Sequence, residues 1–276
     1  MKKIEKPDIP QFQADVLRFY QQHGRPFAWR HISDPYKVFV SEIMLQQTQT
    51  SRVIEKYNSF IDTFPTVHTL AQASLADVLL LWQGLGYNRR AKFMWLCAQE
   101  VVQKHNGLFP RDEKELCKLP SIGSYTAGAI MAFAYNIPTV FIETNIRAVF
   151  IHSFFQEHAV VHDADILPLI EQSLDTRNPR DWYYALMDYG VHIKAQFPGV
   201  NKKSSHYTKQ SKFHGSNRQI RGAIIRFLTQ KGAAQEDELL SCIDRSRNKI
   251  LQIIDNLIDE KMISKKNNTI LLGHNI

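Results

Sequence analysis

The helical spacing of apolar residues along the first 200 positions is the feature that most limits the fold of this chain. Apolar residues recur every three to four positions in successive segments, and short runs of Pro, Gly and Asn separate these segments. In these 200 positions, apolar and polar residues do not alternate with a period of two for long enough to suggest a sheet. The predicted helices cover residues 12–22, 36–47, 51–64, 75–82, 91–105, 113–119, 124–135, 145–154, 166–174 and 182–193. We therefore predict a mainly all-α protein.

A change of composition near residue 200 predicts a second, smaller part. A polar, basic stretch is followed by three further helical patterns, at residues 217–231, 236–243 and 246–260. Two short strands should then meet at Asn267-Asn268, because Asn suits the turn of a hairpin. This order predicts a winged helix-turn-helix. The expected organisation is a helical domain over 8–200, with one lobe at about 31–140 and a second from the N-terminal helix plus 141–200, then a linker at 201–215 and a winged unit at 216–276.

The charge distribution favours a polyanionic partner. The 276 residues carry a formal net charge of +7, and the stretch from Tyr189 to Gln235 has nine Lys and Arg residues but no Asp or Glu. Such a stripe attracts nucleic acid through the release of counterions. The same composition also suits a solvated basic loop.

Other compositional features exclude some classes of protein. No apolar run approaches the roughly 18 residues of a membrane span, and the first residues lack the apolar core of a signal peptide, so we expect a cytoplasmic protein. Only Cys97, Cys117 and Cys242 are present, each among apolar neighbours, and they form no CxxC pair. They are interpreted as reduced core thiols, and we expect no metal site and no iron–sulfur cluster.

A glycine turn at Ile122-Gly123-Ser124 predicts a backbone-binding hairpin. It joins two helical segments within Leu119-Pro-Ser-Ile-Gly-Ser-Tyr-Thr-Ala-Gly-Ala-Ile130. A turn of this kind directs N–H groups of a helix N-terminus at one point, which holds a phosphate without reading sequence. The residues predicted to contact nucleic acid here are Ile122, Gly123, Ser124, Tyr125 and Thr126.

Five separated blocks resemble the helix-hairpin-helix DNA glycosylases, specifically the A/G-specific adenine glycosylases of the MutY type. The resemblance covers about residues 10 to 195, and the order and spacing of the blocks fit the family. The blocks are Arg25-Pro-Phe-Ala-Trp-Arg30, residues 34–49 with Ser41-Glu-Ile-Met-Leu-Gln-Gln-Thr48, Leu81-Trp-Gln-Gly-Leu-Gly-Tyr-Asn-Arg-Arg-Ala91, the hairpin, and Ile142-Glu-Thr-Asn-Ile-Arg147.

The resemblance implies two catalytic carboxylates. Glu42 matches the family's general acid, which protonates N7 of an extruded adenine; such an acid needs a raised pKa and should lie in a dry pocket. Glu143 stands where the family has an aspartate that stabilises the sugar cation, so its extra methylene moves the carboxylate by roughly an angstrom. Asn145 matches the family pattern, and Tyr125 completes the implied catalytic set.

Other matched positions imply DNA binding. Gln46, Gln47 and Tyr87 resemble the residues that enter the helix and fill the gap left by a flipped base, and Arg90 follows in the same block. For Tyr87 and Tyr125, aromatic core packing is an alternative interpretation. Where lyase-competent relatives have lysine, this chain has Tyr125, which cannot form a Schiff base, so a monofunctional glycosylase is expected.

Two departures from the family are visible. The four-cysteine iron–sulfur motif is absent, and a basic loop with Lys202 and Lys203 is expected to contact DNA in its place. The part after residue 213 is too short for the usual 8-oxoguanine-reading domain. Two roles stay open for the winged unit. In one, it replaces that domain and the basic residues at the start of its third helix contact a DNA groove or phosphates; in the other, that helix only packs against the catalytic domain.

The implied function is excision of adenine opposite 8-oxoguanine or guanine in base excision repair. The expected partner is double-stranded DNA with a mispair or an oxidised base, and the protein is expected to be a monomer, associated with the bacterial nucleoid and not with membranes. Two alternatives stay open at this point. One is a glycosylase of the same fold for T or U opposite G, and the other is a catalytically impaired DNA-binding homologue.

Overall fold

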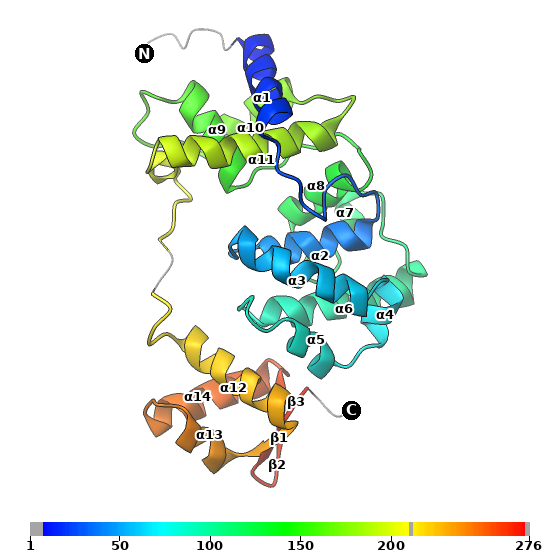
Figure 1. The fold of residues 1–276 in the computed structure, drawn as a ribbon, viewed down its shortest axis with the longest axis vertical. Coiled ribbons are helices and arrows are strands. Elements are labelled where there is room, and N and C mark those ends of the chain that lie inside the picture. The colour runs from blue at the N-terminus through cyan, green and yellow to red at the C-terminus, as the bar shows by residue number, and fades with distance from the viewer. Residues whose placement is uncertain (1–7, 210–211, 274–276) are drawn as a thin grey trace. The chain divides into compact units, whose positions relative to one another are not determined.

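The computed structural model describes residues 8–209 and 212–273. Its regular elements are mainly helical, as predicted (Figure 1). The helices are α1 (Ile9–His23), α2 (Pro35–Leu45), α3 (Thr50–Thr63), α4 (Val67–Gln72), α5 (Leu75–Leu81), α6 (Arg89–His105), α7 (Glu113–Leu116), α8 (Ser124–Phe133), α9 (Thr144–Phe154), α10 (Asp163–Ser173), α11 (Pro179–Gln196), the 3-10 helix η1 (Val200–Lys203), α12 (Asn217–Lys231), α13 (Glu236–Cys242) and α14 (Arg247–Asp259). The strands are β1 (Ala233–Gln235), β2 (Ile263–Lys266) and β3 (Thr269–Leu272).

Helix α4 was not predicted from apolar spacing. It has only six residues, and its start is fixed by a reciprocal cap. The Thr66 hydroxyl accepts the Thr69 backbone N–H at 3.2 Å, and the Thr69 hydroxyl accepts the Thr66 N–H at 3.1 Å. Capping of this kind satisfies N–H groups that a short helix cannot pair internally.

The chain forms two compact units, which do not follow the predicted domain limits. Unit 1 comprises the described residues of 1–39, 110–118 and 122–209, and unit 2 comprises 40–109, 119–121 and the described residues of 210–276. The winged part thus groups with residues 40–109, and residues 110–118 and 122–140 group with the N-terminal helix. The predicted linker includes residues 210–211, which lie outside the described residues, as do residues 274–276 of the predicted winged unit.

Aromatic side chains form the core of unit 1. Phe12 of α1 lies 5.3 Å from Phe150, 5.0 Å from Phe154 and 6.0 Å from Trp182, measured between ring centroids. Helix α1 therefore packs on α9 and α11, and burial of such large rings contributes strongly to stability. This packing fixes α9 and α11, the two helices that carry one half of the candidate site.

The helical core of unit 2 surrounds Trp82. Its side chain is fully buried, lies 6.4 Å from the Phe60 ring, and donates its indole N–H to the Gly86 carbonyl at 2.9 Å. A buried indole N–H without an acceptor would cost free energy, so this bond also shapes the turn after α5.

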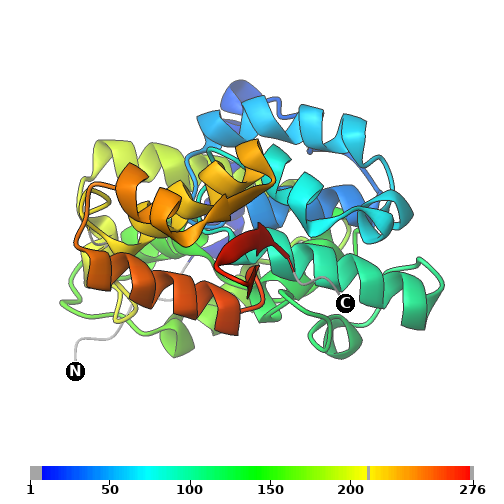
Figure 2. The same ribbon diagram turned by 90° about the horizontal axis from the view of Figure 1, so that it is seen from below.

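The winged part has the predicted order of elements, with one addition. β2 and β3 form an antiparallel hairpin, and the unpredicted strand β1 pairs with β3, giving the order β1-β3-β2. Figure 2 shows the helices and strands of the winged part in orange to red. Asn267 and Asn268 have φ of 47° and 63°, the left-handed conformation that a two-residue hairpin turn requires. The predicted Asn-Asn turn is confirmed.

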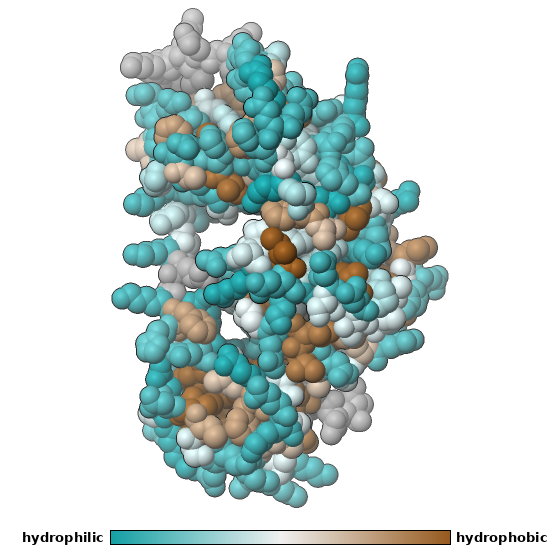
Figure 3. Space-filling view, in the orientation of Figure 1, coloured by the Kyte–Doolittle hydropathy of each residue, from teal (hydrophilic) through white to brown (hydrophobic). Residues whose placement is uncertain are grey.

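The surface seen in Figure 3 is mainly hydrophilic, with small hydrophobic patches. Large exposed apolar side chains among the described residues include Leu108 and Phe213. Within the described residues, no helix has both the length and the apolar character needed to cross a membrane.

Candidate active site and nucleic-acid interface

Helix α2 carries Glu42 in a buried position. The Asp34 carboxylate accepts the Tyr36 backbone N–H at 2.9 Å, which caps the start of the helix. Most of the helix is then enclosed: Glu42 is only 5% exposed, and Val40, Ile43 and Met44 of the same helix are buried. Burial of a carboxyl group favours its protonated form. The predicted burial of Glu42 is thus observed, and its role as a general acid stays a prediction.

Two of the predicted helix-entering residues lie in strained backbone conformations. Gln47 is exposed with φ of 53°, and Tyr87 is half-buried with φ of 48°, after Gly84 and Gly86 at φ of 95° and 70°. Non-glycine residues with positive φ are uncommon and concentrate at functional sites, where the surrounding structure enforces them. We call Gln46, Gln47 and Tyr87 the wedge residues.

Arg90 is the group that enforces both turns. Its Nη1 donates to the carbonyls of Ile43, Met44 and Gln46 at 2.5–3.0 Å. Its Nη2 donates to the Thr48 hydroxyl at 2.9 Å and to the carbonyls of Leu85 and Gly86 at 3.1 and 3.2 Å. Burial lowers the pKa of Arg90 to about 10, so the guanidinium stays charged at neutral pH.

The contacts of Arg90 are therefore internal. Its Nε is buried and has no hydrogen-bond partner among the described residues. The predicted contact with DNA stays a prediction, while the structure gives Arg90 a supporting role that the sequence did not reveal. It links the end of α2, just after Glu42, to the loop that carries Tyr87.

The predicted hairpin separates into exposed and buried positions. Gly123 and Ser124 are exposed and Tyr125 is half-buried, whereas Ile122 and Thr126 are only 4% and 2% exposed. The last two could therefore reach DNA through backbone atoms rather than side chains. Gly123 is the N-cap residue of α8 and, as a glycine, offers no side chain to cap the helix. A Cβ placed on Gly123 would meet nothing within 4 Å. The glycine leaves space on the outside of the turn.

Tyr125 reaches from the hairpin toward the segment that precedes α9. Its ring makes an edge contact with Phe141 at 5.8 Å between centroids, and Phe141 in turn stacks on Tyr183 at 3.9 Å. Aromatic packing is thus a real part of the role of Tyr125, and it places this residue near the chain segment leading to Glu143.

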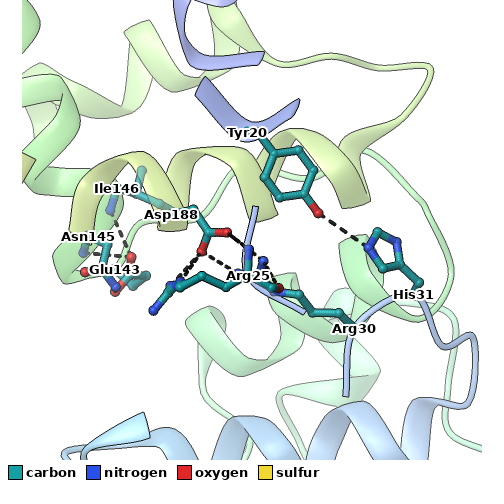
Figure 4. A network of polar contacts seen from close by, with 8 residues as sticks. All are labelled: Tyr20, Arg25, Arg30, His31, Glu143, Asn145, Ile146 and Asp188. Carbon is teal, nitrogen blue, oxygen red and sulfur yellow. Dashed lines mark hydrogen bonds and ion pairs between the residues drawn. The ribbon is translucent and has the colours of Figure 1, made fainter. Parts of the chain in front are cut away.

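Glu143 caps the N-terminus of α9 with its carboxylate (Figure 4). Oε1 accepts the backbone N–H groups of Asn145 and Ile146 at 2.7 and 2.9 Å, and Oε2 accepts the Asn145 side-chain amide at 3.1 Å. Burial raises the pKa of Glu143, against the opposing effect of these hydrogen bonds and of the Lys194 ammonium. The side-chain oxygen of Asn145 is buried without a hydrogen-bond partner among the described residues. The two predicted catalytic residues Glu143 and Asn145 are thus in direct contact.

An ion triad with a buried carboxylate, missed by the sequence analysis, lies beside this cap. Asp188 of α11 accepts Arg25 Nε at 2.7 Å, the Arg25 backbone N–H at 2.8 Å, and both terminal nitrogens of Arg30 at 2.7 Å. Burial would raise the pKa of Asp188, but the two guanidinium groups and these hydrogen bonds hold it below its usual value. In Figure 4 the Arg25 side chain extends beneath Asp188 toward Glu143. In the sequence, the only indication of this triad was the pair of arginines, Arg25 and Arg30, within one of the family blocks.

Helices α11 and α9 approach each other closely at Gly190. A Cβ on Gly190 would lie 2.3 Å from the Asn145 carbonyl oxygen and 2.7 Å from the Asn145 Cβ. Backbone atoms cannot rotate away as a flexible side chain could, so the helices themselves would have to separate.

Gly190→Ala is therefore expected to destabilise the fold by about 1–3 kcal/mol, the usual cost of overpacking a tight core. Unfolding in urea, followed by circular dichroism, measures this loss. Gly222→Ala in α12 is the matched control, because its Cβ would meet nothing within 4 Å. The control should be neutral or stabilising by up to about 1 kcal/mol, since alanine favours helix. Equal stability of the two variants would contradict the close approach.

Lys194 of α11 adds a charge beside Glu143. Burial lowers the pKa of Lys194, while the Glu143 carboxylate raises it and Arg25 lowers it. The same Lys194 charge lowers the pKa of Glu143. Protonation of these two groups is therefore linked.

Lys194→Met is expected to move the acid limb of the pH–rate profile to higher pH. A carboxylate that stabilises a cation works only when ionised, above its pKa, and removal of the neighbouring ammonium raises that pKa further. Single-turnover base excision from pH 4.5 to 8.5 measures the limb. Lys202→Met, which removes an exposed charge of the same unit, should leave the limb where it is. An acid limb at the same pH in Lys194→Met and in the wild type would contradict the linkage between the protonation of Lys194 and that of Glu143.

Backbone pairing with Val161 orders the basic loop at residues 203–205. The Val161 N–H donates to the Lys203 carbonyl at 2.8 Å, and the Ser205 N–H donates to the Val161 carbonyl at 3.0 Å. Lys203 Nζ donates to the Gln156 carbonyl at 2.5 Å, whereas Lys202 is exposed. This part of the predicted linker therefore belongs to unit 1.

The donor set of the chain does not fit an iron–sulfur cluster. Such a cluster is held by four thiolates, but the chain has three cysteines, and they lie on α6, at the end of α7 and on α13. The described residues also contain no group of three or more His, Cys, Asp and Glu side chains that could hold a metal ion.

The predicted site residues thus fall into two sets. Glu42, the wedge residues and Arg90 lie in unit 2, and Ile122 to Thr126, Glu143, Asn145, Lys202 and Lys203 lie in unit 1. Each unit holds one of the two predicted catalytic carboxylates.

Comparison with known proteins adds independent evidence. Residues 40–164 match the family model "HhH-GPD superfamily base excision DNA repair protein". The chain is 42% identical over 187 residues to the adenine DNA glycosylase of Buchnera aphidicola subsp. Baizongia pistaciae, covering 66% of this chain but only 52% of that relative. It is 30% identical to the adenine DNA glycosylase of Mycolicibacterium smegmatis over 90% of this chain and 92% of the relative.

A solved structure supports the fold. A thermostable thymine-DNA glycosylase is similar over 72% of this chain and 96% of its own, with a TM-score of 0.60 and 24% identity. At this identity the likeness shows the fold and not the substrate. Together with the near full-length match to the mycobacterial relative, these findings show that the chain belongs to the adenine DNA glycosylases of the HhH-GPD superfamily of base excision DNA repair proteins.

Proposed function

We propose that this protein is a monofunctional DNA glycosylase that excises adenine paired with 8-oxoguanine or guanine. The observation that carries the proposal is the buried carboxyl group of Glu42, 5% exposed on α2 within the block shared with the family. A buried carboxyl group favours the protonated state that a general acid needs near neutral pH.

Adenine is the base for which such an acid is useful. Its N7 accepts a proton, and protonated adenine leaves the sugar far more easily than the neutral base. Thymine and uracil have no equivalent nitrogen, so the buried Glu42 favours adenine over the pyrimidine alternative. Retention of the acid also argues against a protein that only binds DNA.

The proposed step moves one proton and one electron pair. Glu42 donates a proton to N7 while the bond from N9 to the sugar C1′ breaks, and the bonding electrons leave with adenine. The Glu143 carboxylate stabilises the cation left on the sugar; water then adds at C1′ and gives up its proton, which restores the protonated Glu42. Asn145 orients the Glu143 carboxylate through the 3.1 Å amide hydrogen bond.

Two features support a glycosylase that hydrolyses the N-glycosidic bond without cleaving the DNA strand and without an iron–sulfur cluster. Tyr125 lacks the amine that would attack the sugar to form a Schiff base. The loop at η1 supplies Lys202 and Lys203 without thiolates, and the open Gly123 turn suits a phosphate of the DNA backbone. We propose double-stranded DNA as the partner, a monomeric protein, and no membrane association.

Single-turnover excision on a panel of duplexes tests the proposal. The panel contains A:8-oxoguanine, A:G, A:C, T:G and U:G, with enzyme in excess and base release read after alkaline cleavage. We expect release from A:8-oxoguanine and A:G and from neither pyrimidine mispair. Strand cleavage without alkali should be absent.

Two results would replace the proposal. Release of T or U in preference to A would assign the same fold to a pyrimidine mispair. Tight binding of A:8-oxoguanine with no release from any duplex would assign a catalytically impaired DNA-binding protein.

A further inference from the structure

The winged part reaches one of the wedge residues directly. Arg218, in the first turn of α12, donates from Nη1 to the Tyr87 hydroxyl at 2.6 Å, and its Cζ lies 5.3 Å from the centre of the Tyr87 ring. We propose that Arg218 is a positioning residue for Tyr87, through which the winged part takes part in base extrusion. This inference rests on the proposed function, because it uses Tyr87 as a side chain that enters DNA.

The winged part also makes polar contacts with residues on both sides of Tyr87 in the sequence. Before it, Gln83 Nε2 donates to the Thr229 hydroxyl of α12. After it, Lys92 Nζ donates to the Glu260 carbonyl, and Arg89 lies 3.8 Å from the Glu260 carboxylate. The Arg218 contact is therefore part of a continuous attachment to the loop between α5 and α6.

Arg218 and Arg221, both on α12, bind different kinds of partner. The acidic group at the end of α14, Glu260, is bound by both terminal nitrogens of Arg221 at 3.1 and 2.5 Å. Arg218 instead donates to the hydroxyl of a tyrosine, the wedge residue Tyr87. Arg218 lies in the stretch from Tyr189 to Gln235 that has basic but no acidic residues, and a basic stretch beside a wedge residue favours approach of DNA phosphates.

Tyr87 is thereby held at both of its ends. At the backbone end, Arg90 binds the Gly86 carbonyl at 3.2 Å, and its Cζ lies 5.5 Å from the ring centre. At the hydroxyl end, Arg218 makes the 2.6 Å hydrogen bond. A side chain already held in one rotamer loses less entropy when it enters DNA, and this saving corresponds to about threefold to tenfold in an equilibrium constant.

A double-mutant cycle tests the inference. The variants are Arg218→Ala, Tyr87→Phe and both together; Tyr87→Phe keeps the ring and removes only the hydroxyl. Two readouts are used: single-turnover adenine release from A:8-oxoguanine, and fluorescence of 2-aminopurine placed beside the mispair, which increases when its neighbour is extruded. We expect each single variant to reduce extrusion about threefold to tenfold and the double variant to be no worse than either, because both remove the same contact. Arg218→Lys should recover part of the loss, since a lysine can still donate to the hydroxyl.

Arg226→Ala is the matched control. Arg226 is exposed on the same helix, so this variant removes an equal charge without touching Tyr87. It should change extrusion less than twofold. Thermal unfolding of all variants should stay within a few degrees of the wild type.

Three results would overturn the inference: additive losses in the cycle, equal losses in Arg218→Ala and Arg226→Ala, or faster extrusion in Arg218→Ala, which would make the contact a restraint. Failure of the proposed function looks different. The wild type would then release no adenine, while the fluorescence cycle would still report whether Arg218 acts through Tyr87.

Discussion

Glu42→Gln is expected to abolish adenine release while DNA binding persists. Glutamine has nearly the same shape as glutamic acid but no proton to donate, so adenine would have to leave unprotonated. General acid catalysis contributes typically about 10²–10⁴-fold to a rate, and loss of that size is expected in single-turnover excision from A:8-oxoguanine. Binding to the same duplex, measured by fluorescence anisotropy, should change little because the charge on the DNA-facing surface is unaltered.

Glu55→Gln is the control for this variant. Glu55 is exposed on α3 in the same unit, whereas Glu42 is 5% exposed on α2. The control should retain the wild-type rate. Adenine release by Glu42→Gln within a few fold of the wild type would show that another group protonates the base, and the buried position of Glu42 would then have only a structural explanation.

Glu143→Asp and Glu143→Asn form the second large test, because they separate charge from geometry. Both side chains are good helix N-caps, so both should keep α9 intact. Only aspartate keeps the negative charge that stabilises a sugar cation. We expect Glu143→Asn to lose on the order of 10²–10³-fold in single-turnover excision, as removal of one electrostatic stabiliser usually does.

The aspartate variant measures the effect of the extra methylene. We expect Glu143→Asp to be at least as fast as the wild type, because it restores the residue that the family pattern has at this position. A rate as low as that of Glu143→Asn would show that this chain has adapted its surroundings to glutamate. Equal rates of wild type and Glu143→Asn would remove Glu143 from the mechanism. Urea unfolding of both variants checks that the cap is preserved.

Local signals in the sequence predicted the elements and some of their turns. Regular apolar spacing places α6 and α11 within a few residues of their observed limits, because a long amphipathic pattern has one stable solution. Asn267-Asn268 predicted its hairpin because few residues accept positive φ. The strand β1, with three residues, is too short for its alternation to be recognised, and it exists because β3 offers it a partner.

The supporting contacts of the site could not be predicted in the same way. Arg90 binds carbonyl groups more than 40 positions away, and Asp188 binds Arg25 across 163 positions. Carbonyl acceptors carry no sequence signature, and an arginine in a basic chain suggests DNA before it suggests its own backbone. The attachment of the winged part to the Tyr87 loop through Arg218 was unpredictable for the same reason. Residue types indicated the chemistry, but only the fold shows how those residues are held.

The pairing of Val161 with the loop at η1 bears on the conditions under which such a protein can work. Peroxide oxidises exposed thiolates, and a loop held by a thiolate-bound cluster depends on those thiolates. In this chain the order of the loop comes from main-chain hydrogen bonds, which neither peroxide nor iron starvation removes. Lys202 and Lys203 of that loop therefore keep their backbone positions under oxidising conditions in which a loop held by thiolates would lose its order.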